Sequence, residues 1–173
     1  MRCFAAVWPG SEAAAALARL ARPPLPGLRW STPDQWHVTL RFFGELAPAE
    51  VDAAAAALGA LAARQDQPVV AEAGPATRFL GTGLIIWPVE GLAPLAREAG
   101  RATGHLGEPP PDRPFLGHLT LARAGRGAAW RDRTDLLAPL ASSWTVTSLS
   151  LVRSDLGPAG ARYHPVAEYP FGL

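Results

Sequence analysis

The sequence contains no lysine, so all 16 of its basic residues are arginines. This absence excludes mechanisms that depend on a lysine side chain, including a P-loop, a Schiff base and a lysine general base. There is one cysteine, Cys3, which excludes an internal disulfide and a zinc site built from cysteines. We expect Cys3 to be a small buried residue of the first strand.

An excess of charge of one sign is also missing, because 16 basic residues face 15 acidic ones and leave a net charge of +1. Proteins that bind long nucleic acids through many phosphate contacts are usually far more basic, whereas recognition of one phosphate needs no excess of positive charge. No apolar run approaches the ~20 residues of a membrane span. The first ten residues predict a strand and not a signal peptide. We therefore expect a protein of the cytoplasm that does not contact a membrane.

The sequence does contain enough apolar material for one compact core, at 49% of its 173 residues. This length predicts one domain over residues 1–173. A helix, a proline-rich loop, a histidine-bearing strand, a second helix and a further strand occur in that order twice. We therefore expect an α+β fold of two pseudo-symmetric lobes, roughly 1–90 and 91–173, with the closing strand crossing over. Each lobe is expected to be an antiparallel sheet backed by helices, with the cleft between them.

The expected elements follow from hydrophobic periodicity and from helix and turn signals. Helices are expected at 11–21, with Ser11 as the N-cap, and at 47–64, 92–106 and 128–141. Strands are expected at 3–8, 35–44, 67–73, 83–88, 118–124, 143–154 and 161–171. Proline-rich loops are expected at 22–33 and 107–117.

Two stretches share a pattern of histidine, apolar residue, threonine and apolar residue, one beginning at His37 and the other at His118. A strand alternates its faces, so each stretch places an imidazole and a hydroxyl on one face above an apolar underside. If the lobes pack about a pseudo-twofold axis, the two faces meet in one cleft. Two imidazoles can then serve as general acid and general base near neutral pH. Two hydroxyls can hydrogen-bond the oxygens of a tetrahedral anion.

The reaction that fits these groups is acid-base hydrolysis of a phosphodiester. One histidine deprotonates water, and the other protonates the departing ribose oxygen. Two histidines without partner carboxylates or thiolates make a poor zinc site, so we expect no metal and no cofactor. Arg123, just after the second motif, could balance charge developing on phosphorus. Strict alternation places Arg123 on the face opposite His118, so it reaches the cleft only if the strand bulges near residue 122.

The paired motifs HVTLRFFGEL and RPFLGHLTLAR resemble those of the 2H phosphoesterase superfamily. The likeness is greatest to the bacterial and archaeal RNA 2′,3′-cyclic phosphodiesterases, also called LigT-like or 2′–5′ RNA ligase proteins. The opening RCFAAVWP resembles that family's Arg-x-Phe-x-Ala strand, and the end of the chain resembles its closing Ser-x-Leu-x-x-x-Gly-x-x-Tyr hairpin. The resemblance covers nearly the whole chain. One departure is Gly117, where the family usually has proline before the second histidine.

The resemblance implies hydrolysis of RNA or nucleotide 2′,3′-cyclic phosphate ends to 2′-phosphates without a metal. His37 and His118 match the two catalytic histidines, His37 as the acid and His118 as the base. Thr39 and Thr120 match the phosphate-binding threonines, and Arg123 matches the arginine after the second motif. A resembling family also joins tRNA half-molecules through 2′–5′ bonds, which makes tRNA fragments candidate substrates.

Phe43, expected on the histidine face, is a candidate for stacking on a terminal base, and a role in the cleft wall is equally consistent with its position. The alternative function is a non-catalytic module that binds RNA ends. Loss of either histidine would favour that alternative, and both histidines are present. We expect a monomer whose partners are RNA ends or nucleotides bearing a 2′,3′-cyclic phosphate.

Overall fold

The computed structural model describes residues 1–125, 132–158 and 160–172. Within these ranges the α-helices are α1 (Ser11–Ala18), α2 (Pro48–Ala63) and α3 (Ala93–Thr103), and the short 3-10 helices are η1 (Pro33–Gln35) and η2 (Thr134–Leu136). The strands are β1 (Arg2–Val7), β2 (Leu28–Trp30), β3 (Val38–Glu45), β4 (Val69–Ala73), β5 (Arg78–Leu80), β6 (Leu84–Glu90), β7 (His118–Ala124), β8 (Ser142–Val146), β9 (Ser148–Gly157) and β10 (Gly160–Pro170).

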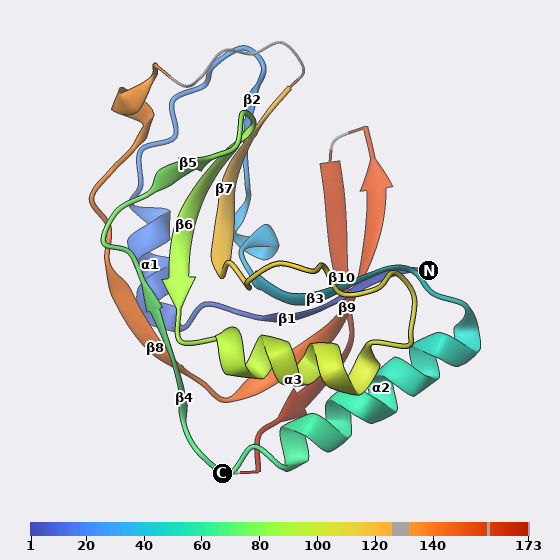
Figure 1. The fold of residues 1–173 in the computed structure, drawn as a ribbon. Helices are drawn as coiled ribbons and strands as arrows, with labels where there is room; N and C mark the ends of the chain where they lie inside the picture. Colours follow the sequence, from blue (N-terminus) through green and yellow to red (C-terminus); the bar gives the residue numbers. More distant parts are fainter. Residues whose placement is uncertain (126–131, 159, 173) are drawn as a thin grey trace.

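The strands form one curved antiparallel sheet in the order β10-β9-β1-β3-β7-β6-β4-β8, with β2 beside β7 and β5 beside β6. We call β10-β9-β1-β3 with α2 and α3 the His37 lobe, and the remaining strands with α1 the His118 lobe (Figure 1). The lobes join where Val38 of β3 pairs with Leu119 of β7. The expected α+β class, with antiparallel sheets backed by helices, is confirmed.

Each lobe takes strands from both halves of the chain. β4 and β6 come from the first half and pair with β8 and β7 of the second, while β1 pairs with β9. The sheet therefore does not divide at the lobe boundary expected between 1–90 and 91–173. Hydrogen bonding between strands determines which strands belong to each lobe. The chain crosses between the lobes more often than the order of its elements suggests.

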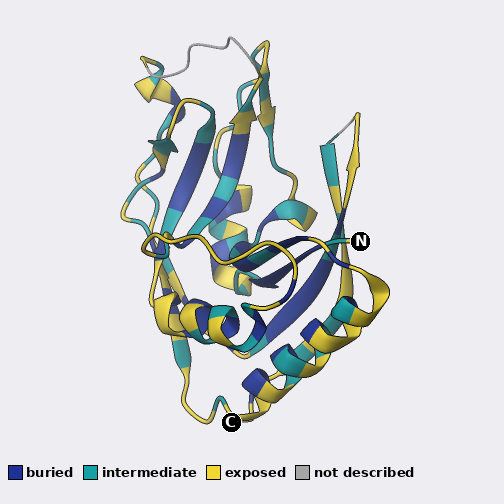
Figure 2. Cartoon of the chain, turned by 45° about the vertical axis from the view of Figure 1, so that its right-hand side comes forward, coloured by how far each residue is buried: buried dark blue, intermediate teal, exposed yellow. Residues whose placement is uncertain are grey.

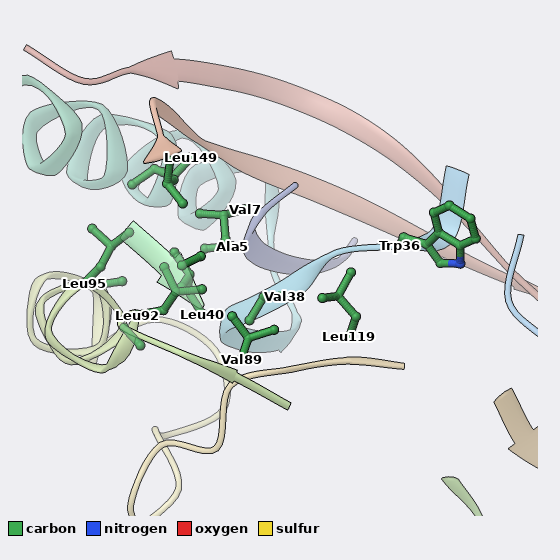
Figure 3. Packing of buried hydrophobic residues seen from close by; sticks show 14 of the residues in the cluster. Ala5, Val7, Trp36, Val38, Leu40, Val89, Leu92, Leu95, Leu119 and Leu149 are labelled. Carbon is green, nitrogen blue, oxygen red and sulfur yellow. The ribbon is translucent and has the colours of Figure 1, made fainter. Parts of the chain in front are cut away.

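One large cluster of buried side chains underlies the junction of the two lobes (Figure 3). Val38 and Leu119 are both fully buried there, beside Val89 of β6 and Leu92 at the start of α3. Burying one such side chain contributes roughly 1.5–3 kcal/mol relative to leaving it exposed. The helices α2 and α3 turn their buried sides toward the sheet and their exposed sides outward (Figure 2). The buried core therefore fixes the positions of β3 and β7, the strands that carry the two motifs.

Most expected elements are confirmed, but several of their boundaries differ. The strand expected from residue 35 begins only at Val38, so His37 lies just before β3. The N-cap of α1 is Gly10 and not Ser11, because the helix already begins at Ser11. The long strand expected over 143–154 is divided into β8 and β9, and Thr147 between them belongs to neither. The division has a structural cause, because β8 pairs with β4 in the His118 lobe while β9 pairs with β1 in the His37 lobe.

Two expected segments have a different structure. The loop expected over 22–33 contains the short strand β2, which pairs with β7. The helix expected over 128–141 lies outside the described residues at 128–131, and the remainder forms only η2 and irregular chain. There the backbone amides of Ala138 and Leu140 donate hydrogen bonds to Thr77 and Pro75 instead of to a helix. Among the described helices, none is long and apolar enough to cross a membrane.

Candidate active site

The two histidine motifs lie side by side at the junction of the lobes. Val38 and Leu119 each follow a motif histidine, and they are opposite each other across β3 and β7. Because this pair is antiparallel, its register runs crosswise and places His37 beside Thr120. His37 and Thr120 accordingly line the same pocket. By the same register Thr39 and His118 are expected side by side on this face, although neither of them lines the pocket that holds His37 and Thr120.

A β-bulge follows each motif at the same position. The extra, unpaired residue is Leu40 in β3 and Leu121 in β7, directly after the motif threonine in both cases. An extra residue in one strand reverses the faces of the side chains that follow it. Leu121 and the next residue, Ala122, are both buried, and Arg123 turns back to the histidine face and lines the pocket. The bulge that Arg123 needs in order to reach the histidine face is therefore present.

Phe43 does not lie at this site. A second bulge in β3 leaves Phe43 unpaired, and its side chain is fully buried in the main core, where the guanidinium of Arg41 lies 5.0 Å from its ring centroid. The hypothesis that Phe43 stacks on a terminal base is wrong, because the bulge turned the ring away from the histidine face. Phe42 occupies that face instead and packs against Phe4.

Aromatic rings surround His37. Its imidazole stacks on Phe4 with ring centroids 4.7 Å apart. It also makes edge contacts with Tyr163 at 4.9 Å and Trp8 at 5.8 Å between centroids. These rings exclude water, and the resulting desolvation lowers the pKa of His37 to about 4. His37 is therefore neutral at pH 7 in the protein without ligand.

Burial also lowers the pKa of His118 below its ordinary value. The positive charges of Arg123, Arg78 and Arg113 lower it further, because a nearby cation disfavours a second positive charge. The charge of Arg123 acts in the same direction on the pKa of His37. Both imidazoles therefore have a basic nitrogen available at neutral pH.

The two imidazoles are oriented by matching hydrogen bonds. Nδ1 of His37 lies 2.8 Å from the carbonyl oxygen of Gln35, and Nδ1 of His118 lies 2.9 Å from that of Leu116. A carbonyl oxygen can only accept, so Nδ1 donates in each case and Nε2 is the nitrogen left for acid-base work. These bonds raise both pKa values, against the larger effect of burial.

The pocket also contains side chains that the sequence reading did not assign to it. Those from β2 and the chain around η1 are Arg29, Ser31 and Gln35, and those from β10 are Ala161 and Tyr163. Gln35 connects the two groups, because its side-chain amide donates to the carbonyl oxygen of Ala161 at 2.7 Å. The signal for Tyr163 was present, since this tyrosine ends the closing hairpin pattern of the family. Arg29 and Gln35 carried no such signal, because Arg29 falls in the segment predicted as a loop and Gln35 is the first residue of the strand expected over 35–44.

Metal ligands do not gather in the described part of the chain: no group of three or more His, Cys, Asp or Glu side chains there is placed to hold an ion. The site instead offers two neutral imidazoles, two hydroxyls and a guanidinium on one face. Such a set can bind a tetrahedral anion and move a proton on either side of it.

Comparison with known proteins agrees with this geometry. The family model described as LigT like phosphoesterase matches residues 7–73. An RNA 2′,3′-cyclic phosphodiesterase of Thermus thermophilus is 35% identical over 182 residues, which cover 94% of this chain and 86% of that protein. One from Geobacillus stearothermophilus is 30% identical over 96% of this chain. This chain spans 56% of the length of the Geobacillus protein.

Solved structures show the same fold. A crystal structure of a Thermus thermophilus protein superposes with a TM-score of 0.84 at 30% identity, covering 99% of this chain and 98% of that one. Escherichia coli LigT in complex with 3′-AMP superposes with a TM-score of 0.75 at 22% identity, over 99% and 98% of the two chains. The second likeness supports the fold alone.

Proposed function

The chain belongs to the LigT-like phosphoesterase family, and we propose that it hydrolyses the 2′,3′-cyclic phosphate at an RNA or nucleotide end to a 2′-phosphate by metal-free acid-base catalysis. The relatives that support the substrate are both RNA 2′,3′-cyclic phosphodiesterases. The observation that carries the proposal is the antiparallel pairing of Val38 with Leu119, a register that would set each histidine beside the threonine of the other strand.

The cyclic phosphate binds on the histidine face between the two strands. The hydroxyls of Thr39 and Thr120 donate hydrogen bonds to its non-bridging oxygens, and the guanidinium of Arg123 balances the charge that grows on them. The two hydroxyls are carried by strands whose core pair, Val38 and Leu119, is buried, so their positions are fixed before the reaction. Preorganised donors of this kind stabilise the transition state more than the ground state.

The chemical step requires one proton transfer on each side of phosphorus. Nε2 of His118 takes a proton from water as the water oxygen bonds to phosphorus, in line with the bond to O3′. The P–O3′ bond breaks, O3′ keeps its electron pair, and Nε2 of His37 supplies the proton that makes it a hydroxyl. The phosphate stays on O2′. A ribose 5′-hydroxyl in place of water would form a 2′–5′ bond by the same steps, which makes ligation of RNA fragments, tRNA halves among them, part of the same proposal.

Binding of the anionic substrate favours the protonated form of His37, the acid. His37 has a pKa of about 4 in the protein without ligand, so it must gain a proton to act as the acid. A phosphodiester anion bound beside it favours the imidazolium and raises this pKa. The effect is strong because the rings of Phe4, Tyr163 and Trp8 keep water away from the imidazole.

Incubation with adenosine 2′,3′-cyclic phosphate in the presence of a chelator tests the proposal. Phosphorus NMR distinguishes the expected adenosine 2′-phosphate from the 3′-phosphate. A 3′-phosphate product contradicts the regiochemistry, and activity that the chelator abolishes contradicts the metal-free mechanism. Tight binding of the substrate without turnover identifies the alternative, a non-catalytic module for RNA ends. The expected monomer and the cytoplasmic location remain predictions.

A further inference from the structure

Two arginines face each other at one end of the pocket. Arg29 of β2 and Arg123 of β7 are directly paired in the strand register, and both line the pocket with His37 and Thr120. Side chains directly opposite on an antiparallel pair project from the same face, so the two guanidinium groups share one side of the sheet. Like charges in this arrangement repel each other, and an anion bound between them removes the repulsion.

No described residue forms an ion pair with either guanidinium. Within 1–125, 132–158 and 160–172, neither Arg29 nor Arg123 makes a hydrogen bond or an ion pair. By contrast, Arg153 on the same hairpin as Tyr163 pairs with Asp155 at 2.9 Å. The guanidinium groups of Arg29 and Arg123 therefore keep their donors for a ligand.

The guanidinium of Arg29 lies next to the β9–β10 hairpin. The guanidinium lies beside Gly160 at the start of β10, so closely that a side chain at that position would collide with it. Gln35 fixes the hairpin next to this point through its bond to Ala161. The Arg29 side chain is exposed, and its guanidinium end lies between β2 and the start of β10 at the mouth of the pocket.

Arg123 shares strand β7 with His118, whereas Arg29 lies opposite Arg123 on the neighbouring strand β2. The charge of Arg123 lowers the pKa of both His37 and His118, whereas Arg29 is not among the charges that shift either pKa. Electrostatic interaction falls with distance. Arg123 is therefore assigned to the phosphate between the two imidazoles, and Arg29 is left for a second anionic group.

We propose that Arg29 binds the 5′-phosphate of the nucleotide whose 2′,3′-cyclic phosphate is cleaved. This proposal rests on the proposed function and adds a substrate class to it: ends that carry a phosphate on both sides of the terminal ribose. In RNA the terminal nucleotide is joined to the chain through such a phosphate, whereas a nucleoside 2′,3′-cyclic phosphate lacks it. A guanidinium matches phosphate with two parallel hydrogen bonds. Arg29 is thus a specificity-determining residue that separates RNA ends and 5′-phosphorylated nucleotides from free nucleosides.

Three substrates test this assignment: adenosine 2′,3′-cyclic phosphate, its 5′-phosphorylated form, and the dinucleotide ApA with a 2′,3′-cyclic end. The second and third both carry the 5′-phosphate, as a monoester and as a diester. In the wild-type protein we expect kcat/KM for these two to exceed that for the first by about tenfold or more, as for one charged hydrogen bond. Arg29→Gln should bring this ratio close to one, a loss of about tenfold or more, and Arg29→Lys should retain part of the preference.

Arg97→Gln is the matched control, because it removes the same charge from an exposed position on α3 and leaves the ratio unchanged. An equal kcat/KM of the wild type on all three substrates overturns the role of Arg29. An equal loss on all three in Arg29→Gln does the same, and so does a preference for the dinucleotide alone, which indicates recognition of the upstream nucleoside. If the wild-type protein turns over none of the three substrates, the proposed function is overturned as well. This outcome differs from a lost preference, in which all three substrates are still turned over.

Discussion

Val38 of β3 and Leu119 of β7 lie directly opposite each other, and this pair sets the arrangement of both motifs. It sits in the buried core and each of its members follows a motif histidine. An antiparallel pair at this point places His37 beside Thr120 and His118 beside Thr39. Each strand therefore supplies one imidazole and one hydroxyl, and neither motif can complete the site alone.

The two threonines should contribute to binding of the reacting phosphate and not to folding. We expect Thr39→Val and Thr120→Val each to lower kcat/KM by about 10-fold or more, as for loss of a hydrogen bond to a charged group. Valine keeps the β-branched shape, so the unfolding free energy should change little. Steady-state kinetics with denaturant unfolding measures both quantities. Thr145→Val, at an exposed position on β8, is the control; a threonine variant as active as this control would remove that residue from the site.

The position of Arg123 predicts that its removal shifts the pKa values of both motif histidines. Its positive charge lowers the pKa of both His37 and His118 in the protein without ligand. Arg123→Gln should therefore raise both pKa values, because the imidazolium forms lose a repelling neighbour. NMR titration of the two imidazole rings measures this, with Arg97→Gln as a control of equal charge change. Unchanged pKa values in Arg123→Gln would show that its guanidinium points away from the site.

Burial of neutral His37 predicts that the protein loses stability in mild acid. The unfolded chain takes up a proton at His37 near its ordinary pKa of 6.5, but the folded protein does so only near a pKa of about 4. As pH falls from 6.5 toward 4, the unfolded state binds more protons, and the unfolding free energy decreases by up to roughly 3 kcal/mol. Denaturant unfolding at several pH values should show a flatter dependence for His37→Gln than for the wild type. The same slope in both proteins would contradict the low pKa of His37.

The sequence predicted the paired His-Thr faces because alternation along a strand is a local property. It could not predict the bulges at Leu40 and Leu121, since an extra residue is defined only by its opposite strand. Those bulges decide that Arg123 enters the pocket and Phe43 leaves it. Arg29 was missed for a related reason, because β2 exists only through its pairing with β7. The break at Thr147 likewise reflects a change of partner strand.

The direction of proton transfer predicts an asymmetry between the histidines. A cyclic substrate with sulfur in place of O3′ has a leaving group that needs little protonation. Such a substrate should restore much of the turnover lost in His37→Ala, the variant without the acid, and little of that lost in His118→Ala, the variant without the base. Single-turnover kinetics on the oxygen and sulfur substrates gives the comparison. The opposite pattern of restoration would exchange the two roles.

Turnover of adenosine 2′,3′-cyclic phosphate by His37→Ala and His118→Ala, with chelator present, tests the two-histidine mechanism most directly. Each substitution should lower kcat by about 10²–10⁴-fold, the usual contribution of a general acid or base. His105→Ala, which removes an exposed histidine after α3, should keep normal turnover. Circular dichroism should show all three variants folded. Near-normal turnover by folded His37→Ala or His118→Ala would contradict the mechanism.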